Sequence, residues 1–306
     1  MPRSILASWL LGVLMFSALL GVVAQMGEIE QFIVLARRLE PRWLALCLAL
    51  QTATYLCESV AWKLVMRRLG YPFAIRRLLP LSVAKLFSDQ AIPSAGLSGN
   101  AFFLSALRRR GVPPVPAMSC VLADLASYFA AYASLAALAL LVLELHGAVY
   151  RWLLAPGVVF IMLQTAVPLA LWYVKRRHPR LPVRSGILQA AARRLSLQPL
   201  AFVQMMALHA GVILLDAATL WTSLRALGLD PAFAPVFSSF VVASAVMSVS
   251  PVPLGLGTFE ASCVAMLHGA GIGLEAGLTA TLLLRGTTTW LPMLPGVWLI
   301  RREMQR

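Results

Sequence analysis

Long apolar segments recur along the whole chain, and their length limits the folds that it can adopt. A helix that crosses a bilayer needs about 20 consecutive apolar residues. Full-length spans of this kind lie near 5–26, 43–69, 117–144, 150–174, 199–227 and 275–300. Of the 306 residues, 60% are hydrophobic and 12% are charged, whereas roughly a quarter of a soluble domain is charged. The sequence therefore predicts an all-α, polytopic membrane protein with a single integral membrane domain over 1–306.

Two further apolar regions are interrupted by prolines and glycines. Residues 78–91 and 97–107 flank the sequence IPSAGLSGN, and residues 233–249 and 258–269 flank SPVPLGLG. Each piece is shorter than the ~20 residues that a crossing needs, and the residues between the pieces favour a turn over a continuous helix. We therefore predict two re-entrant helical hairpins, each of which enters and leaves the membrane on one side.

The basic residues predict how the chain is oriented. The net charge of +14 could indicate a nucleic-acid partner, but most of the basic residues flank apolar segments, which is the positive-inside pattern of a membrane protein. Basic residues stand on both sides of the first hairpin: Lys63, Arg67, Arg68, Arg76 and Arg77 before it, and Arg108, Arg109 and Arg110 after it. We expect cytoplasmic N- and C-termini, a retained first helix rather than a signal peptide, and a second hairpin that enters from outside.

The two interrupted regions resemble each other in sequence. A shift of 160 residues places Pro93 on Pro253, Asn100 on Glu260 and Gly111 on Gly271. We therefore predict an inverted-topology repeat, with one unit over about 43–144, a second over about 199–300, and a cytoplasmic linker over about 175–198. Paired, Gly/Pro-interrupted segments in two halves of a membrane protein point to a transport site near the bilayer midplane.

The second half of each hairpin should begin with free backbone N–H groups, which attract anions. Gly96, Gly99, Gly255 and Gly257 would allow an anionic group to approach that backbone closely. In a membrane, the phosphate of a lipid is the obvious candidate for this group.

Two charged residues of the second repeat unit admit structural and functional interpretations. Glu260 lies in the first turn of a predicted half-helix, where it can support the helix start, as the order Thr258-Phe259-Glu260 suggests. The alternative is a direct role in substrate binding or proton transfer. Arg285 lies inside the last span, where a charge is costly and requires a partner. Glu260 and Asp124 are the candidate partners, and the pair is either a structural salt bridge, a phosphate site or a gating pair.

Other acidic residues inside apolar segments are candidate interior groups. Asp89 follows Lys85 by one helical turn, so a local ion pair is expected. Glu58 and Asp216 should face the interior. The candidate substrate-binding residues are Pro93, Gly96, Gly99, Asn100, Pro253, Gly255, Gly257, Thr258, Glu260 and Arg285, and the candidate gating or charge-pair residues are Asp89, Asp124, Glu58 and Asp216. The scattered cysteines and histidines lack metal-ligand spacing, so no metal, cofactor or catalytic residue is predicted.

The two motifs carry a family resemblance over nearly the whole chain. PVPLGLGTFEAS, followed by LLLRGTTTWLPMLPG, resembles the C-terminal signature of the transmembrane region of lysyl-phosphatidylglycerol synthases and of related stand-alone flippase-like proteins. FSDQAIPSAGLSGNAFFLSALRRRGVP is similar to the first signature of that family. Relatives often carry an acidic residue near the position of Asn100, so the resemblance does not extend to proton or cation coupling through that hairpin.

The resemblance implies lipid translocation. We expect a bacterial inner-membrane flippase that binds an anionic or zwitterionic lipid headgroup, and no aminoacyl-lipid synthesis, because the chain ends at Arg306 without a soluble transferase domain. The alternatives are a membrane-embedded lipid-modifying transferase and an accessory subunit of an envelope-lipid pathway, such as a hopanoid or aminoacyl-lipid pathway. Membrane lipids, a second copy of the chain and a pathway enzyme are the candidate partners.

Overall fold

The described part of the chain is helical. The structure is a computed structural model that describes residues 41–91, 97–145, 151–177, 191, 199–250, 252 and 255–304, and no strand occurs among them. The elements are α3 (Pro41–Arg68), α4 (Ile75–Ala91), α5 (Leu97–Arg109), α6 (Pro114–Leu145), α7 (Arg151–Arg177), α9 (Pro199–Ala226), α10 (Phe233–Val249), α11 (Thr258–Gly269), α12 (Leu274–Arg285), the π-helix η2 (Gly286–Trp290) and α13 (Leu291–Met304). The predicted first span at 5–26 and most of the predicted linker lie outside the described residues.

Three of the described helices are long and apolar enough to cross a membrane. They are α3, α6 and α9, with 28, 32 and 28 residues, and they coincide with three of the predicted spans. The last predicted span, 275–300, is divided differently from the expectation: α12 ends at Arg285, one π-helical turn follows, and α13 continues to Met304. The prediction of an all-helical, multi-pass membrane protein is therefore confirmed.

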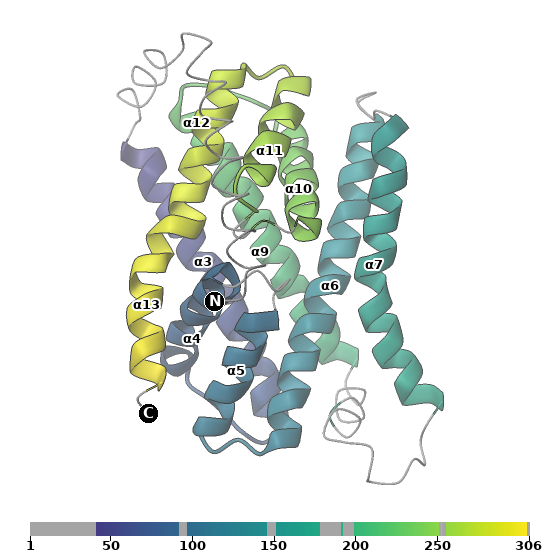
Figure 1. Ribbon diagram of the computed structural model, residues 1–306, viewed down its shortest axis with the longest axis vertical. Coiled ribbons are helices and arrows are strands. Elements are labelled where there is room, and N and C mark those ends of the chain that lie inside the picture. The colour runs from purple at the N-terminus through teal and green to yellow at the C-terminus, as the bar shows by residue number, and fades with distance from the viewer. Residues whose placement is uncertain are drawn as a thin grey trace.

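Both interrupted regions form pairs of short helices. The helices α4 and α5 pack against each other, as do α10 and α11. We call α4–α5 the lower hairpin and α10–α11 the upper hairpin, because they occupy opposite halves of the molecule in Figure 1. The chain enters and leaves the lower hairpin at the bottom of that view and the upper hairpin at the top. The breaks fall where the Pro/Gly sequences predicted them.

The second helix of each hairpin ends in the same way. Gly111 after α5 and Gly271 after α11 have positive φ values of 82° and 86°, a conformation that side chains disfavour and that glycine adopts at low cost. In each case the glycine N–H and the following N–H donate back to the last turn, from Gly111 to Arg108 and from Gly271 to His268, for example. This is the Schellman motif, which also ends α3 at Gly70 and α9 at Gly228. Gly111 and Gly271 are the pair that the 160-residue shift superimposes.

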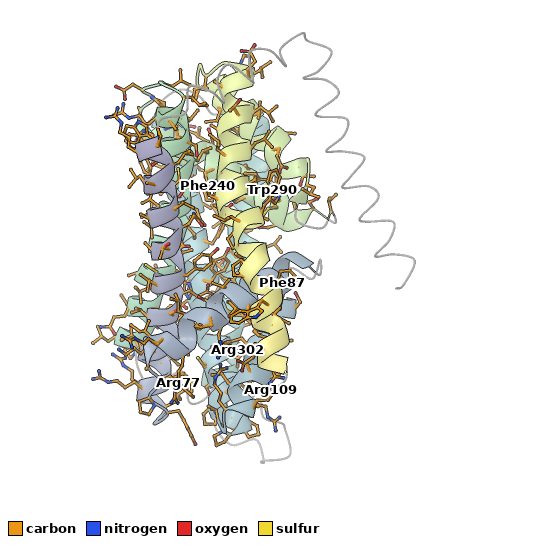
Figure 2. The ribbon with its side chains drawn as sticks, turned by 90° about the vertical axis from the view of Figure 1, so that its left-hand side faces the viewer. Arg77, Phe87, Arg109, Phe240, Trp290 and Arg302 are labelled. Atoms are coloured by element: carbon orange, nitrogen blue, oxygen red, sulfur yellow. The ribbon has the colours of Figure 1, made fainter. Side chains whose placement is uncertain are left out.

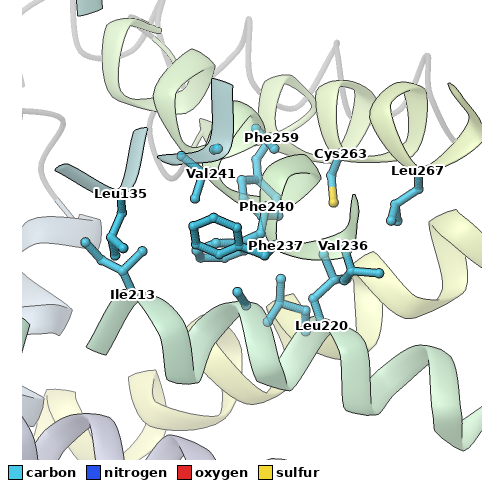
Figure 3. Packing of buried hydrophobic residues seen from close by; sticks show 14 of the residues in the cluster. Leu135, Ile213, Leu220, Val236, Phe237, Phe240, Val241, Phe259, Cys263 and Leu267 are labelled. Carbon is cyan, nitrogen blue, oxygen red and sulfur yellow. The ribbon is translucent and has the colours of Figure 1, made fainter. Parts of the chain in front are cut away.

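Each hairpin packs against its own apolar core. In the upper core, Phe237, Phe240 and Phe259 lie between the hairpin and α9, and the last two rings meet edge to face at 6.1 Å (Figure 3). In the lower core, Trp62 on α3 stacks on Phe103 on α5 with ring centroids 3.9 Å apart. Burial of such large rings provides much of the driving force for packing. The Phe240–Phe259 contact joins the two helices of the upper hairpin, and the Trp62–Phe103 stack joins the lower hairpin to α3.

Apolar side chains also cover the outer surface of the molecule. On α7, Val158, Val159, Met162 and Leu163 are exposed, and Leu141 on α6 is exposed as well. A soluble monomer rarely exposes so many neighbouring apolar side chains. This surface is suited to contact with lipid chains.

Candidate functional site

A buried ion pair joins the start of α11, the second helix of the upper hairpin, to the end of α12. Arg285 Nε at the end of α12 donates to Glu260 Oε1 on α11 at 3.0 Å. The exposed fraction is 0% for Glu260 and 4% for Arg285. Two charges removed from water in this way are stable only with close partners. The structure therefore confirms Glu260 as a partner of Arg285.

The second oxygen of Glu260 supports the start of its own helix. Oε2 accepts the Gly257 N–H at 2.7 Å, and this N–H would otherwise be an unsatisfied donor at the beginning of α11. Thr258 Oγ1 donates to the Gly255 carbonyl at 2.9 Å and closes the same turn. The predicted helix-start role of Glu260 is thus confirmed, and its role with substrate stays a prediction.

The turn before α11 is closely packed. Gly255 has a φ of +60°, and a Cβ at this position would lie 2.8 Å from Met247 Sδ on α10. The same sulfur lies 3.8 Å from Arg285 Nη1. The small size of Gly255 therefore brings the broken end of the upper hairpin close to the Glu260–Arg285 pair.

The π-helical turn follows Arg285 directly. Arg285 Nη1 donates to Thr289 Oγ1 at 3.2 Å, and the guanidinium group lies 5.3 Å from the centre of the Phe259 ring. Single π turns often mark functional sites because they displace side chains from the regular helical positions. Here the turn places the Thr289 hydroxyl beside the arginine.

In the lower hairpin, Asp89 near the end of α4 accepts a backbone N–H from the start of the next helix, as Glu260 does from within its own helix. Its Oδ1 accepts the Gly99 N–H at 2.7 Å, near the start of α5. A Cβ on Gly99 would lie 2.6 Å from the Lys85 carbonyl oxygen and would overlap the Asp89 carboxylate. Two of the four glycines predicted to admit an anion, Gly99 and Gly257, therefore donate their N–H groups to carboxylates of the protein itself.

Lys85 is the centre of a second buried group of charges. Its Nζ lies 2.8 Å from Glu58 Oε1 and 2.7 Å from Asp124 Oδ2. The other oxygen of Asp124 accepts the Trp62 Nε1–H at 2.8 Å and lies 3.2 Å from His209 Nε2. We call these five residues the lower charge cluster; they come from α3, α4, α6 and α9. Two carboxylates face one lysine in it, so acidic groups outnumber the lysine.

One expected and one candidate ion pair are not formed. Asp124 pairs with Lys85 and not with Arg285, and Lys85 pairs with Glu58 and Asp124 and not with Asp89. The predicted pairing of Lys85 with Asp89 was wrong, because helices α3 and α6 bring the carboxylates of Glu58 and Asp124 to Lys85. The Asp89 carboxylate instead accepts the Gly99 N–H. Ion pairs between helices depend on packing, which spacing along one helix does not predict.

The remaining predicted residues divide into three groups. Asp216 on α9 accepts the Gln51 side-chain N–H at 2.9 Å, so it faces α3 as expected. Asn100 is buried on α5, next to Gly99. Pro93, Gly96 and Pro253 lie outside the described residues.

Three residues of the lower charge cluster were not predicted as site residues: Lys85, Trp62 and His209. Lys85 could have been found from its position inside an apolar segment, since charged residues there are rare and often functional. Nothing in the spacing of Trp62 or His209 indicates Asp124 as a neighbour. Across the described residues, no three His, Cys, Asp or Glu side chains are arranged to hold a metal ion.

These features define a multi-pass helical membrane protein with two broken helical hairpins and buried charges beside each of them. The chain belongs to the family described as the lysylphosphatidylglycerol synthase TM region, whose model matches residues 9–296. The match confirms the family resemblance of the two Pro/Gly motifs. No curated protein matches the chain significantly.

Proposed function

We propose that the protein is a lipid flippase of the bacterial inner membrane that binds a lipid headgroup near the bilayer midplane. In this proposal the two hairpins are re-entrant, belong to an inverted-topology repeat and meet at the headgroup site. The matched Schellman ends of α5 and α11, and the hairpins' positions in opposite halves of the molecule, support the repeat. Membership of a family of lipid-related membrane proteins supports the substrate class.

The observation that carries the proposal is the buried Glu260–Arg285 pair at the broken end of the upper hairpin. A phosphate has the same charge sign and the same acceptor oxygens as the Glu260 carboxylate, and arginine binds both in similar geometry. A headgroup phosphate can therefore exchange with Glu260 for Arg285 and for the Gly257 N–H. Release of the phosphate would restore the internal pair, so that the empty site never leaves Arg285 buried without an anion.

The lower charge cluster and Asp89 would provide the second half of the site. Because acidic groups outnumber Lys85, this region favours the cationic part of a zwitterionic headgroup rather than a second phosphate. Asp89 and Asp216 would act as further charge-pair residues on the path. Gly99 and Asn100, at the start of α5, would contact the headgroup once Asp89 moves from the Gly99 N–H.

A translocation assay with purified, reconstituted protein tests the proposal. Vesicles carry a fluorescent phospholipid, and a membrane-impermeant quencher reports how much label becomes accessible with time. Arg285→Gln should slow translocation about tenfold or more, the loss expected for one charged hydrogen bond in a buried site. Glu144→Gln, an exposed glutamate at the end of α6, is the matched control and should leave the rate unchanged.

Two results decide against the proposal. Wild-type translocation equal to that of protein-free vesicles would remove the flippase function, and a wild-type rate for folded Arg285→Gln would remove this residue from the site. Lipid extracts of the same vesicles are analysed by mass spectrometry. A new lipid species formed from added donor would favour the transferase alternative instead.

A further inference from the structure

A cavity lies at the end of the molecule where α4 begins and α13 ends, away from the Glu260–Arg285 pair. It has a volume of about 540 Å³, a size typical of ligand pockets. Its charged lining consists of Arg76, Arg77, Arg110, Arg302 and Glu303. Figure 2 shows Arg77 and Arg302 at the lower end of the molecule, together with Arg109.

The cavity has an excess of positive charge. Arg110 is engaged with Glu303 through contacts of 2.7 and 2.9 Å. The Arg302 guanidinium carbon lies 5.3 Å from the centre of the Trp298 ring, a contact with an aromatic face rather than with a carboxylate. Among the described residues, neither Arg76 nor Arg77 forms an ion pair. Three guanidinium groups therefore face the cavity without a described carboxylate to neutralise them.

The rest of the lining is apolar. Phe73, Leu81 and Leu299 face the same space as the arginines. Apolar side chains do not stabilise a bound inorganic ion, whereas a molecule with a charged head and an apolar body can contact both kinds of lining. The combination favours an amphiphile over a small anion.

The helices α4 and α13 pack closely about one turn away from the cavity-lining residues Ala84 and Leu299. A Cβ on Gly296 would lie 2.7 Å from Phe87 Cβ, so the glycine allows α13 to approach α4 directly. The cavity lies toward the basic ends of these two helices, which carry Arg76, Arg77 and Arg302. Ala84 lines the cavity and the next residue, Lys85, belongs to the lower charge cluster. Neighbouring residues of α4 therefore line the cavity and the proposed translocation path.

We propose that this cavity binds the phosphodiester headgroup of an anionic glycerophospholipid from the adjacent leaflet. Arg76, Arg77 and Arg302 bind the phosphate, and Phe73, Leu81 and Leu299 contact the glycerol and the first methylenes of the chains. Clusters of arginines at a membrane surface attract acidic lipids, and the cavity adds a defined place for one of them. The site is separate from the proposed midplane site and does not require that lipid be translocated.

The test is lipid binding to the purified full chain in detergent micelles, followed by native mass spectrometry. The probe is dioleoylphosphatidylglycerol, with dioleoylphosphatidylcholine and inorganic phosphate as the comparison ligands. Arg76→Gln/Arg77→Gln should weaken binding of the anionic lipid about tenfold or more. The matched control is Arg108→Gln/Arg109→Gln, which removes two exposed arginines from the same end of the molecule and should change binding by less than about threefold.

A second variant separates shape from charge. Leu299→Trp fills the cavity without changing its charge, and it should reduce binding of the anionic lipid as strongly as the double arginine variant. It also decides the matter if Arg76→Gln/Arg77→Gln fails to fold.

The proposal is overturned by equal losses in the two double arginine variants, which would indicate a diffuse surface field. Equal binding of the zwitterionic lipid would indicate an unspecific lipid contact. Displacement of the anionic lipid by millimolar phosphate would indicate a site for the free ion. Because the assay involves no translocation, a failure of the flippase proposal leaves this result unaffected.

Discussion

Glu260 uses each of its two carboxylate oxygens for a different task. One oxygen accepts the Gly257 N–H and completes the first turn of α11, while the other pairs with Arg285 on α12. The same side chain therefore fixes both the local turn and the packing between two helices. Asp89 performs the first of these tasks in the lower hairpin, at Gly99.

Removal of Glu260 should destabilise the protein strongly. Glu260→Ala leaves Arg285 buried without its carboxylate and the Gly257 N–H without its acceptor, and breaking a buried pair from one side typically costs about 3 to 5 kcal/mol. Thermal unfolding in detergent micelles, followed by circular dichroism, measures the change. Glu144→Ala, at an exposed position, is the control and should stay within about 0.5 kcal/mol of wild type.

The double variant makes this prediction stricter. Glu260→Ala/Arg285→Ala should cost less than the sum of the two single changes, because the first substitution already removes the partner of the second. Additive losses would show that the two side chains do not stabilise each other, contrary to the geometry.

Lys85 should be equally important in the lower hairpin. Lys85→Met keeps most of the apolar stem but leaves Glu58 and Asp124 near each other without the cation that joins them. We expect a loss of about 3 kcal/mol or more in the free energy of unfolding. Lys63→Met on α3 is the control, since Lys63 forms no ion pair among the described residues. A stability equal to wild type would contradict the role assigned to Lys85.

At the scale of helices, the lower hairpin depends on the close approach of α4 to the start of α5. Gly99→Ala would push a methyl group against the Lys85 carbonyl oxygen and the Asp89 carboxylate. Such overpacking typically costs about 1 to 3 kcal/mol, and it should be visible as a lower melting temperature.

Gly273→Ala provides the matched control for this prediction. Gly273 has a negative φ of −57° at the start of α12, and a Cβ there would meet nothing within 4 Å. The control should melt like wild type. An unchanged melting temperature for Gly99→Ala would indicate that α4 and α5 are farther apart than described.

The helix breaks were predictable, and the tertiary pairing was not. Proline and glycine act locally, so the ends of α4, α5, α10 and α11 follow from the residues at the breaks. The π turn after Arg285 leaves the apolar pattern of 275–300 almost unchanged, so hydropathy gives no sign of it. The sequence left Glu260 and Asp124 as alternative partners of Arg285, because the pairing depends on which helices become neighbours.

At the scale of the whole molecule, the charges are distributed unevenly between the two ends. The ends of α3, α5 and α13 and the start of α4 carry the basic residues Lys63, Arg67, Arg68, Arg76, Arg77, Arg108, Arg109, Arg110 and Arg302. At the opposite end, the basic residues Arg42, Arg151 and Arg225 are balanced by the acidic residues Glu144, Asp230 and Glu275. Loops rich in lysine and arginine remain on the cytoplasmic side of bacterial membranes, so the lower end in Figure 1 should be cytoplasmic.

Cysteine accessibility in intact cells tests this orientation together with the opposite directions of the hairpins. The background is a variant without Cys47, Cys57, Cys120 and Cys263, to which Arg109→Cys or Asp230→Cys is added. Arg109 is the last residue of the lower hairpin and Asp230 precedes the upper hairpin, and both are exposed. A membrane-impermeant maleimide should label the thiol from Asp230→Cys in intact spheroplasts and the thiol from Arg109→Cys only after the membrane is permeabilised. Labelling of both thiols in intact spheroplasts would place the two hairpin openings on one side, and the inverted repeat, with its site between two opposed hairpins, would then be wrong.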